Sequence, residues 1–544
     1  MTGYEVMARV LAAEGVTDLS AFPMQELIET SAGIGIRPII CRQERTGVNI
    51  ADGYARVTNG TRLGVFTMQY GPGAENAFAG VAQAYADSVP LLHLAGGAPT
   101  SRQGIAPTFE AVRAYRSVTK WAAQIRNAAD VPAMVRRAVG QLKHGRRGPV
   151  LLEMIHDAMQ RDYPGAEVDY CPVTPRRSAA ASEDVRDLVA ALLAARNPVL
   201  IAGQGVLYAE AWDELVAFAE LAQIPVLTTL AGKSAFPETH ALALGTGGLT
   251  YTLMVSRFLA EADFIVGIGT SFTRNTFTTP MPDSAVLAQV TNCGEDLGKD
   301  YPVAHGAVGD ARLVLEQMLE EYRRQDGPKV RGDGNGAVRR VAAVTAEFAA
   351  QWEPHFSSDE VPISPYRVIR ELQQAFTGER TIVTHDSGYP RDQMVPMWKT
   401  VEPRGYLGWG KSTQLGYGLG LAIGAKLAAP ERNVINVMGE AAFGMSGLDI
   451  ETAVRSEIPI LTVVLNNGVM TKYDHHMPEA TERYGSNRLG GNYAGVAAAL
   501  GAHAQRVATP DELGPALQRA QAANREGQTA LVEVLSKAEP RVAP

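Results

Sequence analysis

Short apolar runs rich in β-branched residues alternate with helical patterns along the whole chain. This alternation is typical of parallel sheets covered by helices on both faces. Strands are predicted at 64–69, 90–95, 149–154, 199–202, 225–230, 264–268, 286–290, 381–384, 434–438, 460–465 and 531–535. The predicted fold class is therefore α/β, with doubly wound parallel sheets.

Two stretches without hydrophobic periodicity divide this pattern. Residues 166–182 are rich in Pro, Arg, Ala and Ser, and the charged, glycine-rich segment RRQDGPKVRGDGNG follows a helix predicted to end near Tyr322. Domains of about 150 residues would divide 544 residues into three or four. We expect three domains, at 1–165, 183–323 and 360–544.

Composition narrows the class of function. The chain is 46% hydrophobic and carries a net charge of −8 with no long run of one sign, which argues against nucleic acid as the main partner. The opening MTGYEVMARVLAAEGV lacks a signal-peptide core, and no run of about 18 apolar residues predicts a membrane span. Cys41, Cys171 and Cys293 are too scattered for a disulfide framework or a zinc site. These features favour a cytoplasmic protein without a membrane partner.

Two segments of the third domain carry polar residues at predicted strand ends. VINVMGEAAFGMSGLDIETA delivers Glu440 after a buried strand, and ILTVVLNNGVM ends in Asn466, Asn467 and Gly468, with Asn467 27 positions after Glu440. Carboxyl strand ends meet at one edge of a sheet, and Mg²⁺ prefers carboxylate, amide and carbonyl oxygens together with phosphate. The pair predicts a metal–diphosphate clamp. The alternative is that Glu440 caps the next helix and the Asn pair forms a turn.

These segments resemble thiamine diphosphate enzymes of the acetolactate synthase, benzoylformate decarboxylase and oxalyl-CoA decarboxylase group, and the resemblance covers nearly the whole chain. In that group a Gly-Asp-Gly segment and an Asn-Asn pair hold the metal and the diphosphate. The resemblance implies a metal ion, Mg²⁺ or another divalent ion, on Glu440, Asn467 and the carbonyl of Val469. It implies cofactor contacts at Gly388, Leu415, Gly439, Ala441, Ala442, Asn467 and Met470. The family aspartate is Glu440 here, so the site must accommodate one extra methylene.

The first domain holds a second matching segment, RQERTGVNIADGYAR. The resemblance makes Glu44 the glutamate that promotes the imino tautomer of the cofactor's aminopyrimidine and so deprotonates the thiazolium. The alternative is a surface glutamate paired with Arg42 or Arg45. Three more residues are placed near the reacting carbon by alignment, with ordinary loop roles as the alternative: Gln25, Gln69 and Tyr70.

Further expectations come from the segment STQLGYGLGLAIGA and from the central domain. The resemblance places Leu415 under the bent cofactor and Gly388 at its diphosphate. It also implies a homodimer or homotetramer, with the cofactor between the first domain of one subunit and the third domain of another. Acetolactate synthases bind FAD with an Arg-Phe-Asp-Asp-Arg segment, but here residues 271–274 read Ser-Phe-Thr-Arg, so FAD is not expected.

Substrate choice is predicted from residues that face the thiazolium. The acetolactate synthase tryptophan falls on His476, which we include among the catalytic candidates, and Thr471 replaces an oxalyl-CoA decarboxylase tyrosine. AFGMSGLDIET and NNGVMTKYD resemble the oxalyl-CoA decarboxylase and 2-hydroxyacyl-CoA lyase branch. This predicts cleavage of a 2-hydroxyacyl-CoA to a carbonyl compound and formyl-CoA. The candidate cations for the CoA phosphates are Arg391, Arg404 and Lys411.

Three alternatives stay open. The chain could be a 2-oxo acid decarboxylase or carboligase of acetolactate synthase type, or an inactive regulatory homologue. An FAD- or NAD-dependent oxidoreductase is disfavoured, because no Gly-x-Gly-x-x-Gly segment follows a predicted strand and opens a helix.

Overall fold

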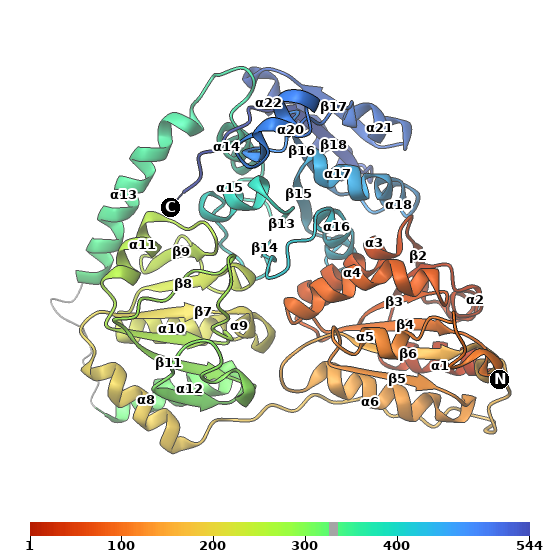
Figure 1. Cartoon of the computed structure of the whole chain (residues 1–544). Coiled ribbons are helices and arrows are strands. Elements are labelled where there is room, and N and C mark those ends of the chain that lie inside the picture. Colours follow the sequence, from red (N-terminus) through yellow and green to blue (C-terminus); the bar gives the residue numbers. More distant parts are fainter. Residues whose placement is uncertain (326–335, 544) are drawn as a thin grey trace.

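The computed structural model describes residues 1–325 and 336–543. Three α/β units occupy the corners of a triangle, and each contains a six-stranded, all-parallel sheet with helices packed on both faces (Figure 1). The predicted fold class is confirmed. Within the described ranges, no helix is long and apolar enough to cross a membrane.

The first unit has the strand order β2-β1-β3-β4-β6-β5. Its strands are β1 (Asp18–Phe22), β2 (Arg37–Ile40), β3 (Gly64–Met68), β4 (Leu91–Gly97), β5 (Trp121–Ile125) and β6 (Val150–Ile155). Its helices are α1 (Gly3–Ala13), α2 (Gln25–Ala32), α3 (Glu44–Val57), α4 (Pro72–Ala86), α5 (Ala111–Tyr115), α6 (Val131–Lys143) and α7 (His156–Met159). Strands β3, β4 and β6 are buried along their whole length, as expected for the middle of a sheet covered on both faces.

The central unit has the order β12-β11-β10-β7-β8-β9, so the chain reverses direction across the sheet between β7 and β10. Its strands are β7 (Pro198–Ala202), β8 (Val226–Thr229), β9 (Ala243–Gly247), β10 (Phe264–Ile268), β11 (Val286–Thr291) and β12 (His305–Val308). Its helices are α8 (Ser182–Ala194), α9 (Gln204–Ala209), α10 (Trp212–Ala222), α11 (Leu253–Ala260) and α12 (Ala311–Arg324).

The third unit has the order β14-β13-β15-β16-β18-β17. Its strands are β13 (Thr381–His385), β14 (Tyr406–Leu407), β15 (Asn433–Gly439), β16 (Leu461–Asn466), β17 (His503–Val507) and β18 (Ala530–Leu535). Its helices are α14 (Pro365–Ala375), α15 (Tyr389–Met397), α16 (Tyr417–Ala428), α17 (Glu440–Ser446), α18 (Ile450–Arg455), α19 (Tyr473–His476), α20 (Pro478–Tyr484), α21 (Tyr493–Ala499) and α22 (Pro510–Arg525).

The connections between units differ from each other. Residues 166–181 contain no helix or strand and run from the first unit to α8, as Figure 1 shows. Most of the predicted second linker, at 326–335, lies outside the described residues. It is followed by α13 (Gly336–Phe356), a helix that the sequence pattern did not predict. Trp352 of α13 packs on Tyr366 of α14, with ring centroids 4.7 Å apart.

Helices α3 and α16 join the first and third units at close range. A Cβ atom on Gly424 would clash with the carbonyl oxygen of Ile50, so this crossing requires glycine. On the same helix α3, the buried guanidinium of Arg56 binds the carboxylates of Asp52 at 2.5 Å and Asp87 at 3.1 Å. The hydroxyl of Tyr417 on α16 donates to Asp52 at 2.8 Å. The two units are therefore fastened by a desolvated charge network.

A fully buried histidine lies in the sheet of the first unit. The ring of His93 in β4 stacks between Phe66 and Tyr115, with centroids 5.6 and 5.1 Å away. Neither ring nitrogen has a hydrogen-bond partner among the described residues. Burial lowers the pKa of His93 to about 3, so the folded protein keeps this imidazole neutral.

We predict that His93→Phe stabilises the protein relative to wild type at acidic pH. The unfolded chain takes up a proton on His93 below its ordinary pKa of about 6.5, whereas the folded chain does so only near pH 3. Above pH 6.5 both states hold His93 neutral, so the free energy of unfolding has its full value. As the pH falls toward 3, the unfolded chain is protonated first and the free energy of unfolding decreases. By pH 5 the loss amounts to about 2 kcal/mol.

Urea unfolding at pH 7 and pH 5 measures this effect, with His475→Phe as the control on an exposed histidine. The free-energy difference between His93→Phe and wild type should grow on acidification, while that of the control should not. An equal pH dependence of both variants would contradict the prediction.

Candidate active site

Three loops of the third unit meet at the carboxyl edge of its sheet. They follow β13, β15 and β16, and the reversal of chain direction between β13 and β15 places them where ligands of open α/β sheets bind. A Cβ atom on Gly439 would lie 3.8 Å from Cγ of Pro390, so the loops after β13 and β15 are neighbours. Gly388 adopts φ +83° and faces open space at the start of α15, so its loop leaves room for a ligand.

The predicted clamp residues lie together. Oε1 of Glu440, the first residue of α17, accepts a hydrogen bond of 2.8 Å from the backbone N–H of Gly468. Oδ1 of Asn467 accepts from the N–H of Val469 at 3.0 Å, and its amide donates to the hydroxyl of Thr471 at 3.1 Å. The expected convergence of the two strand-end segments is therefore present.

The environment of Glu440 fits a cation. Its side chain is 4% exposed, burial raises its pKa, and no ion pair reaches it from the described residues. A buried carboxylate without a positive partner is costly, and the adjacent amide and carbonyl oxygens are hard-cation ligands. Ala441 and Ala442 follow in the first turn of α17. Met470 uses its backbone N–H internally, bonding the carbonyl of Asn487 at 2.7 Å.

A second buried carboxylate, that of Glu533, holds the residue next to Asn467 of the clamp. Glu533 of β18 is fully buried and accepts from the side-chain amide of Asn466 at 2.7 Å and from the N–H of Ala494 at 2.8 Å. Arg506 pairs with the same carboxylate at 3.1 Å. Asn466 is thus fixed by the neighbouring strand, which orients the adjacent Asn467.

Asp386 is a residue of this edge that the sequence analysis did not single out. Its carboxylate, fully buried after β13, accepts backbone N–H groups of Ser387 at 2.8 Å and of Gly416 and Gly418 at 2.9 Å each. Burial raises the pKa of Asp386 to about 6. The carboxylate therefore ties the Gly388 loop to the start of α16, where Leu415 stands.

The candidates in the first unit gather at the carboxyl edge of their own sheet. Gln69 and Tyr70 follow β3, Gln25 opens α2 after β1, and Tyr70 is 54% exposed. A Cβ on Gly96, at the end of β4, would contact both the backbone of Tyr70 and the side chain of Met24, so these loops are neighbours.

Glu44 is a buried residue without a cationic partner in the described part of the chain. It is 4% exposed at the start of α3 and accepts a hydrogen bond of 3.2 Å from the amide of Asn76. Arg42 pairs with Glu451 at 3.7 Å and Arg45 donates to the carbonyl of Met445, so neither provides the surface ion pair considered as the alternative for Glu44. No hydrogen bond or ion pair among the described residues joins Glu44 to Glu440 or Asn467.

The predicted CoA-binding cations lie elsewhere than expected. Arg391 and Arg404 are each 4% exposed, so they are interior residues and not cations at the mouth of a site. Arg391 pairs with Asp392 at 2.8 Å, and Arg404 donates to the side chain of Asn59 at 2.7 Å. Their burial disagrees with the expectation that they bind CoA phosphates at the cofactor mouth. The fifth catalytic candidate, His476, ends the short helix α19 and is exposed.

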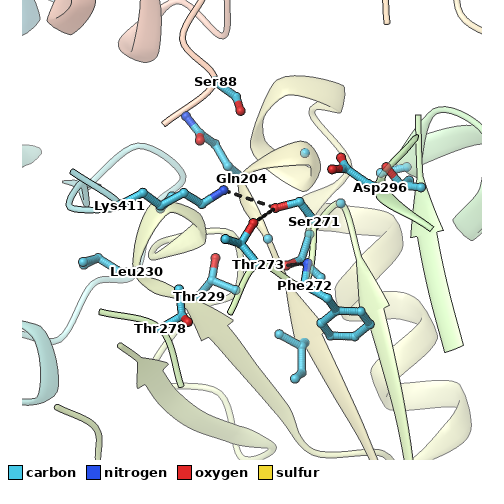
Figure 2. A pocket seen from close by; sticks show the side chains of 18 of the residues that line it. Ser88, Gln204, Thr229, Leu230, Ser271, Phe272, Thr273, Thr278, Asp296 and Lys411 are labelled. Carbon is cyan, nitrogen blue, oxygen red and sulfur yellow. Dashed lines mark hydrogen bonds between the residues drawn. The ribbon is translucent and has the colours of Figure 1, made fainter. Parts of the chain in front are cut away.

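Lys411 lines a separate cavity between the central unit and the loop before α16. Figure 2 shows its amine pointing to the hydroxyl of Ser271, at 3.2 Å, which in turn contacts the hydroxyl of Thr273 at 2.8 Å. The cavity lies at the carboxyl ends of β7 and β10, beside the reversal point of the central sheet. Arg146, from the first unit, also lines it.

Comparison with known proteins finds one matching family model in each of the three α/β units. Residues 1–125 match the model of the N-terminal TPP binding domain of thiamine pyrophosphate enzymes, residues 185–318 the central domain, and residues 386–534 the C-terminal TPP binding domain. The chain therefore belongs to the thiamine diphosphate-dependent enzymes, whose cofactor is bound together with Mg²⁺.

Relatives are similar over nearly their full length. The probable acetolactate synthase large subunit of Methanococcus aeolicus is 28% identical, over 96% of this chain and 90% of the relative. The acetolactate synthase isozyme 3 large subunit of Escherichia coli K12 is 28% identical over 100% and 96%. Glyoxylate carboligase of Escherichia coli O157:H7 is 28% identical over 96% and 91%.

We predict that Asp386→Asn weakens binding of thiamine diphosphate by about tenfold to a hundredfold. Hydrogen bonds to a charged group contribute about 1.5–3 kcal/mol, and the amide of Asn would oppose one of the backbone N–H groups that the carboxylate accepts. Calorimetric titration of the cofactor with Mg²⁺ present measures the change.

The matched control is Asp263→Asn, because Asp263 also accepts two backbone N–H groups, of Arg196 and Asn197 at 2.8 Å each, but lies in the central unit. The control should bind the cofactor as wild type does. An unchanged dissociation constant in Asp386→Asn would remove the link between this carboxylate and the cofactor loops.

Proposed function

We propose that this protein is a thiamine diphosphate-dependent decarboxylase and carboligase of 2-oxo acids, of acetolactate synthase type. The similarity over nearly the whole chain to acetolactate synthases and a glyoxylate carboligase carries this proposal. The buried site candidates support it, because an inactive homologue would have no need to keep Glu44 and Glu440 desolvated without a cation.

The clamp would hold the metal and the diphosphate end of the cofactor. Glu440, Asn467 and the carbonyl of Val469 are the proposed metal ligands. The diphosphate would contact Gly388, Gly439, Ala441, Ala442 and Met470, with Gly388 at the N-terminus of α15, an end of a helix that attracts anions. Leu415 would support the bend of the cofactor from the loop that Asp386 fixes.

Bound thiamine diphosphate supplies a nucleophilic carbon and accepts the electrons of the breaking carbon–carbon bond. In the proposed mechanism, Glu44 holds a proton at its carboxyl group next to the aminopyrimidine. This carboxyl group is 4% exposed, and Asn76 orients it. Gln25, Gln69, Tyr70 and His476 are the proposed polar groups around the substrate.

Glu44 and the clamp would meet between subunits. Within the described chain Glu44 shares no hydrogen bond or ion pair with Glu440 or Asn467, although its neighbour Arg45 donates to the carbonyl of Met445 in α17. We infer a homodimer, or a homotetramer built from such dimers, in which the first unit of one subunit faces the third unit of its partner.

The 2-hydroxyacyl-CoA alternative has less support. Two of the three cations nominated for the CoA phosphates, Arg391 and Arg404, are buried against other parts of the chain. The segment AFGMSGLDIET remains the observation in its favour, so a thioester belongs among the substrates to be compared.

Glu44→Gln should lower turnover of a 2-oxo acid by about 10²–10⁴-fold, because the amide cannot exchange the proton with the aminopyrimidine. Cofactor content and subunit assembly should be unchanged. Steady-state rates with pyruvate measure the loss, and Glu29→Gln on the exposed face of α2 is the control for a carboxylate-to-amide change. Retention of more than a tenth of the activity would remove Glu44 from the mechanism.

The substrate class is tested by product analysis with pyruvate, glyoxylate and a 2-hydroxyacyl-CoA. We expect release of CO₂ and a new carbon–carbon bond from the oxo acids, with kcat/KM at least about a hundredfold above that for thioester cleavage, a difference of about 2.7 kcal/mol in transition-state binding. Formyl-CoA as the main product, with inert oxo acids, would favour the lyase branch. No reaction with any of them would favour the inactive homologue.

A further inference from the structure

We propose that the cavity between the central unit and the loop before α16 binds a small organic monocarboxylate, held by the amine of Lys411 and the hydroxyls of Ser271 and Thr273. The proposal is independent of the carboligase function, because it concerns a different cavity and a ligand that need not react.

Most charged side chains around the cavity are already paired with each other or with neighbouring residues. Three cationic side chains and three acidic side chains line it: Arg146, Arg147, Lys411, Asp87, Asp296 and Asp310. Arg146 pairs with Asp296 at 2.7 Å, and Asp296 also binds Lys299 at 3.2 Å. Asp87 pairs with Arg56 at 3.1 Å and Asp310 with Arg177 at 3.9 Å, so each lining carboxylate already has a cationic partner.

Arg147 and Lys411 line the cavity without an ion pair among the described residues, and Lys411 is the one beside the two hydroxyls. Its amine makes no ion pair within residues 1–325 and 336–543, and its recorded partner is the hydroxyl of Ser271. Its backbone N–H, in contrast, is fixed by Asp87 at 3.1 Å. A partly buried ammonium group with a neutral partner gains most from an anion, because Coulomb attraction is strengthened where water is scarce.

The size and walls of the cavity select the rest of the ligand. Its volume is about 160 Å³. A protein cavity of about 150 Å³ holds benzene, whereas typical small-molecule sites measure about 300–1,000 Å³. Apolar side chains also line the cavity, among them Leu230, Phe277 and Met281. A carboxylate with a small apolar body fits a cavity of this volume and lining, whereas a dinucleotide is too large for it.

The hydroxyl groups supply the second half of the carboxylate site. Ser271 and Thr273 follow β10 on a loop where Phe272 has φ +44°, a conformation that turns its ring away from the two hydroxyls, as Figure 2 shows. Ser271 lies within hydrogen-bond distance of both Lys411 and Thr273, and Thr273 accepts from Lys299 at 3.1 Å. A carboxylate could replace the single Lys411–Ser271 contact with bonds to both groups.

Equilibrium dialysis of the full-length protein with benzoate tests the proposal, because benzoate has the required charge and size and is not a 2-oxo acid. Wild type should bind benzoate, and Lys411→Met should bind it at least about tenfold more weakly, while Lys411→Arg should stay within about fivefold. The matched control is Lys120→Met: burial lowers the pKa of both lysines to about 8, but Lys120 lies outside the cavity. The control should bind within twofold of wild type.

The pH dependence provides a second readout that a purely structural role of Lys411 would not produce. Burial and nearby Arg146 and Lys299 lower the pKa of Lys411 to about 8, against the opposing effect of Asp87 and Asp296. Because only the charged amine attracts a carboxylate, affinity should fall about tenfold per pH unit above 8. Benzyl alcohol, which has no charge, should bind without this dependence or not at all.

Competition separates the two sources of the carboxylate. Displacement of benzoate by pyruvate would identify the reaction's own acid as the occupant, and lack of displacement would identify a separate effector; both support a carboxylate site. Absence of benzoate binding to wild type, equal binding in Lys411→Met, or tighter binding of ADP than of benzoate would overturn the proposal. If these results come with normal carboligase activity, the proposed function is unaffected.

Discussion

The buried ion network around Arg56 is the interaction on which the arrangement of the two cofactor-binding units depends. One guanidinium from the first unit neutralises Asp52 and Asp87, and these carboxylates bind Tyr417 and the backbone N–H groups of Gly410 and Lys411 from the third unit. Removing Arg56 would leave two desolvated carboxylates, which costs far more than losing a surface pair. The network also explains why α3 and α16 approach closely enough to need glycine at the crossing.

Within the third unit, buried carboxylates fix the loops at the carboxyl edge of the sheet. Apolar side chains packed there would fill the space that a ligand needs. Asp386 binds three backbone N–H groups from two loops, and Glu533 fixes Asn466 next to the clamp. Both carboxylates are satisfied by the protein itself. Glu44 differs from them, since its hydrogen-bond partner is the amide of one side chain, Asn76, and Glu440 accepts backbone N–H groups of the turn after β16 without a cationic partner among the described residues.

The sequence predicts the interior of this fold better than its edges. The strand expected at 264–268 is β10 with the same bounds, and the other predicted strands agree within two residues, because buried parallel strands are continuous apolar runs. The edge strands β2, β5, β9, β12, β14 and β17 were missed, and so was β1 inside the first sheet; β5, β12 and β17 have partly exposed patterns that resemble loops. The sequence predicts that Glu440 and Asn467 lie close together, because each follows a strand and carboxyl strand ends meet at one edge of a sheet. Asp386 and Glu533 could not be predicted this way, because their partners come from distant segments. Arg391 and Arg404 were expected at the mouth of the cofactor site and are buried instead. The sequence did not indicate this burial, because most arginines lie at the surface and Arg404 is bound by a residue distant in sequence.

The close union of α3 and α16 has a consequence for assembly. Because Glu44 begins α3, its position relative to the third unit of its own chain is fixed by that packing. In the proposed dimer, the distance from Glu44 to the partner's clamp then depends only on how two rigid bodies meet. A twofold axis makes that contact twice with the same residues. The two catalytic centres should therefore form in one step, and a dimer with a single competent centre should not occur as an assembly intermediate.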